Sequence, residues 1–180
     1  MRIISGKYKG KRLIAPKKLP VRPTTDMAKE ALFNILNNRF YFDELRIIDL
    51  FAGTGNISFE FASRGAKEII AVDSYIGCVQ YISKTAKELD FPITVLKSDV
   101  FTYLERTKEK AALFFADPPY NFEDAKFEKI INLVFEKDLL LEGGLLIIEH
   151  SDQTDLSQNE HFSDSRKYGG SIFSFFDSIS

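Results

Sequence analysis

The sequence has one cysteine, two histidines and no long apolar run. A single cysteine, Cys78, excludes an internal disulfide and a zinc site built from several cysteines. The histidines, His150 and His161, lack the spacing of metal ligands, so we expect no metal. No apolar run approaches the ~18 residues of a membrane span, and the opening MRIISGKYKGKRL lacks the apolar core of a signal peptide. These absences favour a protein of the reducing cytoplasm without a membrane span.

Acidic residues are missing from the first 25 positions, which carry eight lysines and arginines. The remaining residues include 16 basic and 26 acidic side chains, so a net charge of −2 hides a basic arm on an acidic body. This asymmetry suggests a polyanionic partner that approaches from one side. A solvated hairpin without a ligand is the alternative interpretation.

The order of apolar runs predicts an α/β fold. The runs at 46–51, 68–73, 93–98, 111–117 and 144–150 alternate with helical patterns at 56–64, 75–89, 100–106 and 124–136. Continuous apolar strands separated by helices are typical of a parallel sheet covered on both faces. Residues 165–176, around Gly169 and Gly170, predict an antiparallel C-terminal hairpin in which 173–176 form a buried edge strand.

The N-terminal part is predicted to be an extension of this sheet domain. Residues 2–5 and 11–14 form a small β-hairpin, and a helix begins at Thr25 or Asp26. Its predicted apolar face consists of Met27, Ala28, Ala31, Leu32, Ile35 and Leu36. We therefore divide the chain into a basic arm, residues 1–24, and one domain, residues 25–180.

A loop with two glycines, Gly53 and Gly55, follows the first long strand and precedes a helix. In doubly wound folds the ligand lies beyond the carboxyl ends of the strands, and glycines there allow close approach to the backbone. The third glycine of the dinucleotide fingerprint is replaced by Ser58. The loop could therefore bind a nicotinamide cofactor, bind a ligand of another kind, or contain glycines with a purely structural role.

Three acids end three successive strands: Asp49, Asp73 and Asp99. A carboxylate at position 49 would repel the pyrophosphate that dinucleotides place at this helix N-terminus. S-adenosylmethionine has no phosphate, and its ammonium group suits Asp49. Asp73 has the position of an acid that binds ribose hydroxyls, and Asp99 could face the adenine amine. Each acid alone could instead cap the helix that follows. Together they predict S-adenosylmethionine.

The stretch ADPPYN follows the fourth strand. Asp117 offers acceptor oxygens at the same crevice, while Pro118 and Pro119 stiffen the turn and remove backbone donors. Tyr120 offers a ring on which a base could stack. Acceptors beside a stacking ring suit an amino group on a flat heterocycle, positioned for attack on a methyl donor. A purely structural turn is the alternative.

The motifs DLFAGTG, Asp73, SDVF and DPPY, in this order, resemble the class I S-adenosylmethionine-dependent amino-methyltransferases. The N-terminal stretch from Arg2 to Leu36 is similar to the bacterial RsmD group, which methylates a guanine N2 in small-subunit ribosomal RNA. The resemblance implies a Rossmann-like, mostly parallel seven-stranded sheet, and it runs from Met1 to about Phe176.

The resemblance also implies roles for individual residues. Asp117 and the backbone of Pro118 would bind the guanine amine, with Pro119 and Tyr120 completing the catalytic turn. The residues expected to bind the cofactor are Asp49, Phe51, Ala52, Gly53, Thr54, Gly55, Asn56, Asp73, Ser74, Asp99 and Val100. Those expected to contact RNA are Arg2, Lys7, Lys9, Lys11, Arg12, Arg22, Thr24 and Lys167.

Three functions stay open at this point. The first is guanine-N2 methylation of ribosomal RNA on a small subunit or its assembly intermediate, by a monomeric enzyme. The second is N6 methylation of adenine in DNA or RNA, because DPPY also occurs in adenine methyltransferases. The third is a non-catalytic, RNA-binding factor in ribosome assembly, which only the basic arm supports.

Overall fold

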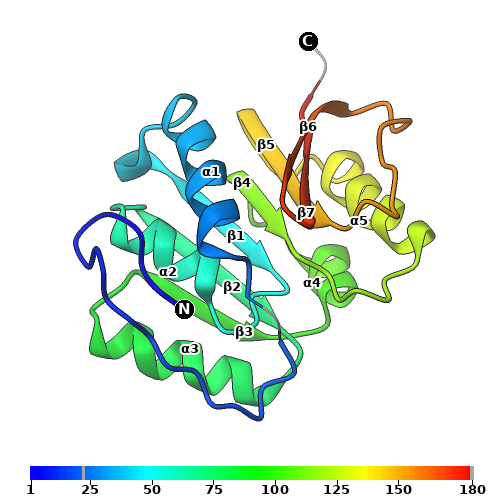
Figure 1. The fold of residues 1–180 in the computed structure, drawn as a ribbon. Helices are drawn as coiled ribbons and strands as arrows, with labels where there is room; N and C mark the ends of the chain where they lie inside the picture. The colour runs from blue at the N-terminus through cyan, green and yellow to red at the C-terminus, as the bar shows by residue number, and fades with distance from the viewer. Residues whose placement is uncertain (22, 179–180) are drawn as a thin grey trace.

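The computed structural model describes residues 1–21 and 23–178, which form a layered α/β structure (Figure 1). Seven strands make one sheet in the order β3-β2-β1-β4-β5-β7-β6. Strands β1 to β5 pair in parallel, and β7 runs antiparallel to both β5 and β6. The strands are β1 (Arg46–Leu50), β2 (Glu68–Asp73), β3 (Ile93–Lys97), β4 (Ala111–Ala116), β5 (Leu140–His150), β6 (Phe162–Tyr168) and β7 (Ser171–Phe176). The predicted mostly parallel sheet with a C-terminal antiparallel hairpin is confirmed.

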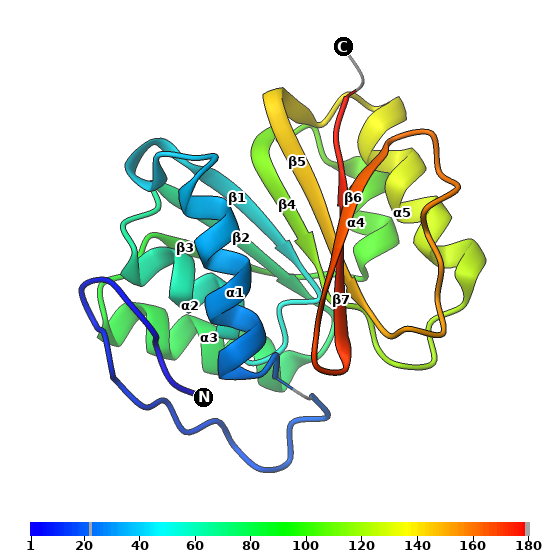
Figure 2. The ribbon, with the colours of Figure 1, turned by 45° about the horizontal axis from the view of Figure 1, so that its top comes forward.

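Five α-helices cover the two faces of the sheet (Figure 2). Neighbouring residues of a strand point to opposite faces, so Ile47 packs with α1 and α2 while Ile48 packs with α4 and α5. The helices are α1 (Asp26–Asn37), α2 (Asn56–Ser63), α3 (Ile76–Glu88), α4 (Val100–Arg106) and α5 (Asp124–Glu136), with a 3-10 turn η1 (Phe42–Glu44). None of these helices is long and apolar enough to cross a membrane.

The strand order reverses direction between β1 and β4. From β1 the chain winds outward through β2 to β3, and then returns to the other side of β1 with β4 and β5. Doubly wound sheets bind ligands at such a switch point, outside the carboxyl ends of the strands. The fold therefore directs attention to the residues that follow β1 and β4.

Two strand predictions were wrong in detail. Residues 173–176 belong to β7, which lies between β5 and β6, so β6 and not β7 is the edge strand. Strand β5 begins at Leu140, earlier than position 144, because Leu140 pairs with Ala111 ahead of an irregularity in the β4–β5 register.

The N-terminal hairpin forms, but with little β-structure. Its pairing is limited to one antiparallel bridge between Arg2 and Arg12, supported by hydrogen bonds such as Ile3 N to Lys11 O (2.9 Å). Ile3 and Leu13 are buried in a cluster with residues of α2 and α3. The basic arm thus packs on the domain as part of its core.

A buried polar network attaches the arm to helices α1 and α2. Glu60 is fully buried and accepts hydrogen bonds from the backbone of Ile4 (3.0 Å) and Ser5 (3.2 Å) and from Arg64 (3.1 Å). Lys29 lies 3.8 Å from Glu60, is 1% exposed, and donates to Arg2 O (2.6 Å). Burial lowers the pKa of Lys29, and the charge of Glu60 opposes that effect. Of the predicted apolar face of α1, Ala28, Leu32 and Leu36 are buried, but the prediction was wrong at Met27, which is 61% exposed.

Candidate functional site

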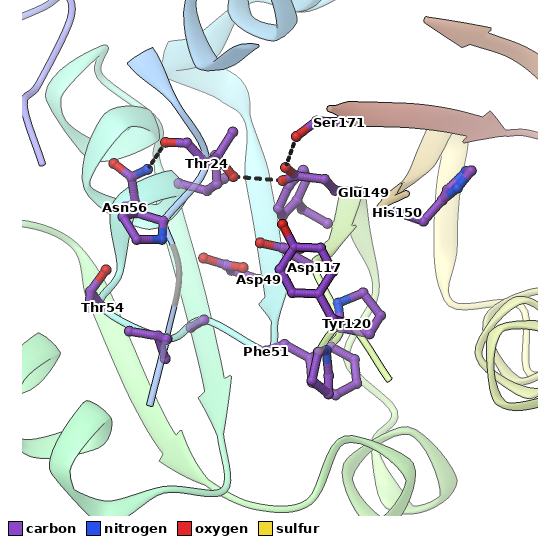
Figure 3. A pocket seen from close by; sticks show the side chains of 18 of the residues that line it. Thr24, Asp49, Phe51, Thr54, Asn56, Asp117, Tyr120, Glu149, His150 and Ser171 are labelled. Atoms are coloured by element: carbon purple, nitrogen blue, oxygen red, sulfur yellow. Dashed lines mark hydrogen bonds between the residues drawn. The ribbon is translucent and has the colours of Figure 1, made fainter. Parts of the chain in front are cut away.

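A cavity of about 870 Å³ lies at the carboxyl ends of the central strands. Its walls come from the end of the arm, the loops after β1, β2 and β4, the end of β5 and the β6–β7 turn (Figure 3). The cavity brings together most of the predicted cofactor and acceptor residues. These are Asp49, Phe51, Ala52, Gly53, Thr54, Asn56, Asp73, Ser74, Asp117, Pro118, Pro119 and Tyr120.

Asp49 is the most unusual group in the cavity wall. It is 1% exposed, and its Oδ2 accepts a hydrogen bond of 2.6 Å from Ser58. Its Oδ1 has no hydrogen-bond partner. Burial raises the pKa of Asp49 to about 7; the Ser58 hydrogen bond opposes this rise, and the nearby charge of Asp73 adds to it. An unpaired, buried carboxylate oxygen in a ligand-sized cavity fits a cationic group of the ligand, such as the ammonium of S-adenosylmethionine.

The loop after β1 owes its shape to left-handed backbone conformations. Gly55 is the N-cap of α2 with φ 82°, and a Cβ there would lie 2.8 Å from Phe59 and 3.0 Å from Ile82. Phe51 has φ 57°, which costs energy for a residue with a side chain. The ring of Phe51 packs edge-on against Phe122, with centroids 5.5 Å apart, so the loop after β1 is held against the loop after β4.

The carboxylate of Asp73 accepts hydrogen bonds from two backbone N–H groups. Gly53 N donates to Oδ2 (2.8 Å) and Tyr75 N donates to Oδ1 (2.9 Å). A carboxylate has about four lone-pair sites, so each oxygen can accept one further donor. Asp73 therefore shapes the glycine loop and still has acceptor capacity for ribose hydroxyls.

Asp99 and Val100 are not among the residues that line the cavity. The side chain of Asp99 is exposed and accepts from Thr102 N (3.0 Å), which makes Asp99 the N-cap of α4. Capping of the following helix is the alternative to cofactor binding that the sequence allows for each strand-end acid. Contact between Asp99 and an adenine amine stays a prediction.

The loop after β4, which we call the acceptor loop (residues 116–121), is rigid at its base and exposed at its tip. Pro118 is buried, while Tyr120 is 72% exposed at the cavity rim. Phe122 N donates to Pro119 O (3.0 Å) and closes the turn. The ring of Phe122 packs on Phe127 at 4.9 Å. Packing thus fixes the position from which Asp117 reaches the cavity.

The structure adds one acid that the sequence reasoning missed. Glu149, near the end of β5, lines the cavity and is 7% exposed. It accepts hydrogen bonds from Thr24 (2.6 Å) and Ser171 (2.9 Å), drawn as dashed lines in Figure 3. The sequence contained a signal for Glu149, because this residue is a further acid near the end of a predicted strand, as Asp49 and Asp73 are.

Thr24 and Asn56 occupy structural positions within the cavity wall. Thr24 was predicted to contact RNA, but its side chain is buried and donates to Glu149, and its carbonyl accepts from Asn56 Nδ2 (3.1 Å). The Oδ1 of Asn56 accepts from Lys29 (2.8 Å). The amide of Asn56 therefore links the end of the basic arm to α1, beside the glycine loop.

The other residues predicted to contact RNA that the structure describes lie outside the cavity lining. Lys7 N donates to Ser63 O (2.7 Å), so the tip of the arm lies at the C-terminal end of α2, remote from the glycine loop. Arg2 pairs with Asp26 (3.2 Å). Lys167 pairs with Asp152 (3.4 Å). Lys9, Lys11 and Arg12 are exposed, and Arg22 lies outside the described residues.

Among the described residues, no group of three or more histidine, cysteine, aspartate or glutamate side chains is arranged to hold a metal ion. The polar side chains of the described cavity residues are carboxylates, hydroxyls, the amide of Asn56, the imidazole of His150 and the thiol of Cys78.

A doubly wound sheet with antiparallel β7, a glycine loop at the switch point and an Asp-Pro-Pro-Tyr turn opposite it define a class I S-adenosylmethionine-dependent methyltransferase. Residues 1–177 match the model of the family described as Conserved hypothetical protein 95, and the chain belongs to this family. The resemblance to the RsmD group is thereby confirmed.

Individual relatives agree with this assignment. The chain is 34% identical over 163 residues to YlbH of Bacillus subtilis, named as an rRNA methyltransferase, with 88% of this chain and 86% of that protein covered. It is 29% identical over 157 residues to ribosomal RNA small subunit methyltransferase D of Escherichia coli K12, with 87% and 77% covered. The solved structure of Escherichia coli yhhF, described as a methyltransferase, superposes with a TM-score of 0.84 at 26% identity and covers 98% of this chain and 96% of that chain.

Proposed function

We propose that the protein transfers a methyl group from S-adenosylmethionine to the N2 amine of a guanine in small-subunit ribosomal RNA. The observation that carries the proposal is the shared cavity of Asp49 and the acceptor loop. The unpaired Oδ1 of Asp49 lies in the half of the cavity that suits a cationic cofactor, the cofactor half. Asp117 and Tyr120 line the other half, the acceptor half, which suits an amino group on a flat base. The names of two relatives, which specify ribosomal RNA and its small subunit, support the substrate class.

The cavity residues have separate roles in this proposal. Asp49 binds the ammonium group of the cofactor, and Asp73 accepts from its ribose hydroxyls. The bound cofactor supplies a methyl group on a positively charged sulfonium. Asp117 and the carbonyl of Pro118 accept hydrogen bonds from the N2 amine, and Tyr120 stacks on the base. The acceptor-only carboxylate also stabilises the positive charge that develops on the amine during transfer.

The basic arm would supply the affinity for RNA. Exposed lysines and arginines that contact phosphates bind without sequence preference and orient the RNA relative to the cavity. Because the arm is packed against α2 and α3, this basic surface has a fixed position relative to the acceptor loop. A guanine taken out of a loop or extruded from a helix would enter the cavity at the exposed ring of Tyr120.

Small ribosomal subunits from cells that lack the gene provide the test. They are incubated with the protein and labelled S-adenosylmethionine, and the ribosomal RNA nucleosides are separated and identified by mass. We expect label in N2-methylguanosine. Label in N6-methyladenosine would instead support the adenine alternative. Subunit binding without transfer would support the assembly factor.

A further inference from the structure

The last part of the basic arm, residues 16–21, passes beside the cofactor half of the cavity, and we call this segment the strap. Figure 1 shows it in blue, running past α3 on its way to α1. Leu19, Pro20 and Val21 line the cavity together with the glycine loop and the loop after β2. Leu19 N donates to Pro16 O (3.2 Å) and Val21 N donates to Leu19 O (2.8 Å), so these backbone donors bond within the strap. At both positions it is the side chain that reaches the domain.

Two glycines make room for these side chains. A Cβ at Gly53, in the glycine loop, would lie 3.3 Å from Cγ1 of Val21. A Cβ at Gly77, near the start of α3, would lie 2.9 Å from Cδ2 of Leu19 and 2.7 Å from Cε1 of Tyr75. Glycine is among the poorest helix formers, so a glycine at such a position usually has a packing reason. The close approach of the strap and of Tyr75 supplies that reason at Gly77.

The strap gives the cofactor half an apolar wall. Ligand cavities combine mostly apolar walls with a few polar groups that orient the ligand. In the cofactor half, Asp49 and Asp73 are such polar groups, and Leu19 and Val21 face the same cavity as apolar side chains. Both side chains are half-buried, so the strap separates the cavity from solvent here. An apolar wall suits the flat faces of an adenine ring and the carbon atoms bonded to a sulfonium.

We propose that the strap is part of the cofactor site, where Leu19 and Val21 contact bound S-adenosylmethionine and contribute to its affinity. This inference rests on the cofactor assignment within the proposed function and does not depend on which base accepts the methyl group. It gives the basic arm a role besides RNA contact. The cofactor in turn stabilises the docked strap, because a ligand that binds one state raises the population of that state.

The first test measures the affinity for S-adenosylhomocysteine by calorimetry, without RNA. Leu19→Ala truncates the apolar side chain and should weaken binding on the order of tenfold, and Val21→Ala should weaken it less. Leu19→Met keeps the apolar volume and should bind nearly as well as the unaltered protein. Ile14→Ala is the matched control, since Ile14 lies in the same arm, is 89% exposed and is outside the cavity lining. Thermal unfolding of each ligand-free variant checks the fold.

The second test asks whether the cofactor holds the strap in place. Lys17 and Lys18 are exposed in the strap, so trypsin can cleave after them, and mass analysis of the fragments gives the rate at each site. Saturating S-adenosylhomocysteine should slow this cleavage by about fivefold or more. Lys11 and Arg12, exposed in the hairpin, are an internal control whose cleavage should not change. A contact that only stabilises the domain would not protect the strap selectively.

The outcomes separate the inference from the proposed function. A protein that does not bind S-adenosylhomocysteine would overturn the cofactor assignment and the inference with it. If the protein binds but Leu19→Ala and Val21→Ala keep the unaltered affinity, only the role of the strap is wrong. Equal protection of the hairpin and the strap would also overturn that role. Weaker binding in Leu19→Ala together with selective protection supports the inference even where no methyl group reaches guanine.

Discussion

The hydroxyl of Ser58 donates a hydrogen bond of 2.6 Å to one carboxylate oxygen of Asp49 and leaves the other oxygen without a partner. Ser58 stands where a dinucleotide-binding loop would have its third glycine. The replacement thus has a structural use, because the hydroxyl orients a buried acid toward the cavity. The pKa of Asp49, raised to about 7 by burial, makes this acid sensitive to pH near neutrality.

We expect cofactor affinity to depend on pH through Asp49. The free protein holds a proton on Asp49 below about pH 7, and a bound ammonium group favours the ionised form, so binding releases a proton. The affinity for S-adenosylhomocysteine should therefore fall by roughly tenfold per pH unit below pH 7. Calorimetry in two buffers of different ionisation enthalpy counts the released protons. Asp49→Asn should bind weakly and without this proton release; an unchanged pH profile in the variant would contradict the assignment.

The same shift affects stability with the opposite sign. A raised pKa means that the folded state holds a proton in the range between about pH 4 and pH 7, where an unfolded aspartate does not. The free energy of unfolding of the cofactor-free protein should therefore fall as pH rises through this window, as far as Asp49 contributes. In Asp49→Asn the fall should be smaller, as measured by denaturant titrations at several pH values.

Replacing Asp117 should separate binding from transfer. Asp117→Ala removes an acceptor for the amine and leaves the glycine loop and Asp49 in place, so cofactor affinity should stay within about twofold while kcat falls by roughly 10²–10³. Calorimetry and labelled transfer to small subunits measure the two effects. A variant that loses cofactor binding in parallel with transfer would show that Asp117 belongs to the cofactor half.

The turn of the basic arm offers a matched pair of glycines. Gly6 and Gly10 have similar left-handed conformations, φ 89° and φ 84°. A Cβ at Gly6 would lie 1.9 Å from the carbonyl oxygen of Ser63, whereas a Cβ at Gly10 meets no atom within 4 Å. Gly10→Ala should cost about 1 kcal/mol of stability from backbone conformation alone. Gly6→Ala should cost clearly more and expose the arm to limited proteolysis; equal effects would mean that the arm does not dock at Ser63.

The contribution of the arm to RNA affinity can be tested with single lysines. Lys9→Ala removes an exposed charge at the arm's turn, and Lys108→Ala removes one near the amino end of β4. If Lys9 contacts a phosphate, its variant should bind small subunits more weakly and lower the slope of log K against log salt by about 1. The Lys108 variant serves as the control and should behave like the unaltered protein.

The sheet was predictable because burial on both faces leaves a simple pattern of continuous apolar runs. The acids of the cavity were predictable where they lie at or near the carboxyl ends of such runs, as Asp49, Asp73 and Asp117 do. Asp99 also ends a run, but its strand β3 is the outer strand of the sheet, and the acid caps α4 outside the cavity lining. The sequence predicts that Asp99 follows a strand. Its distance from the cavity depends on where that strand lies in the packed sheet, which the sequence pattern does not show.

The buried charges were not predictable from the pattern. Lys29 and Glu60 lie on helices, where charged residues usually mark the solvent side. Their burial depends on groups far away in sequence, including the backbone of Ile4 and the amide of Asn56. No local spacing encodes such contacts. The tight attachment of the arm, which the sequence predicts only as a small hairpin extension, follows from this network.

The walls of the cavity come from segments far apart in the sequence, since Thr24 and Ser171 both donate hydrogen bonds to the carboxylate of Glu149. A ribosome that synthesises this protein releases Thr24 well before Ser171. The acceptor half of the cavity is therefore incomplete in every nascent chain until β7 has emerged. Partly made chains would have the cofactor loop without the finished pocket for a base, which would confine base recognition to chains that extend through β7.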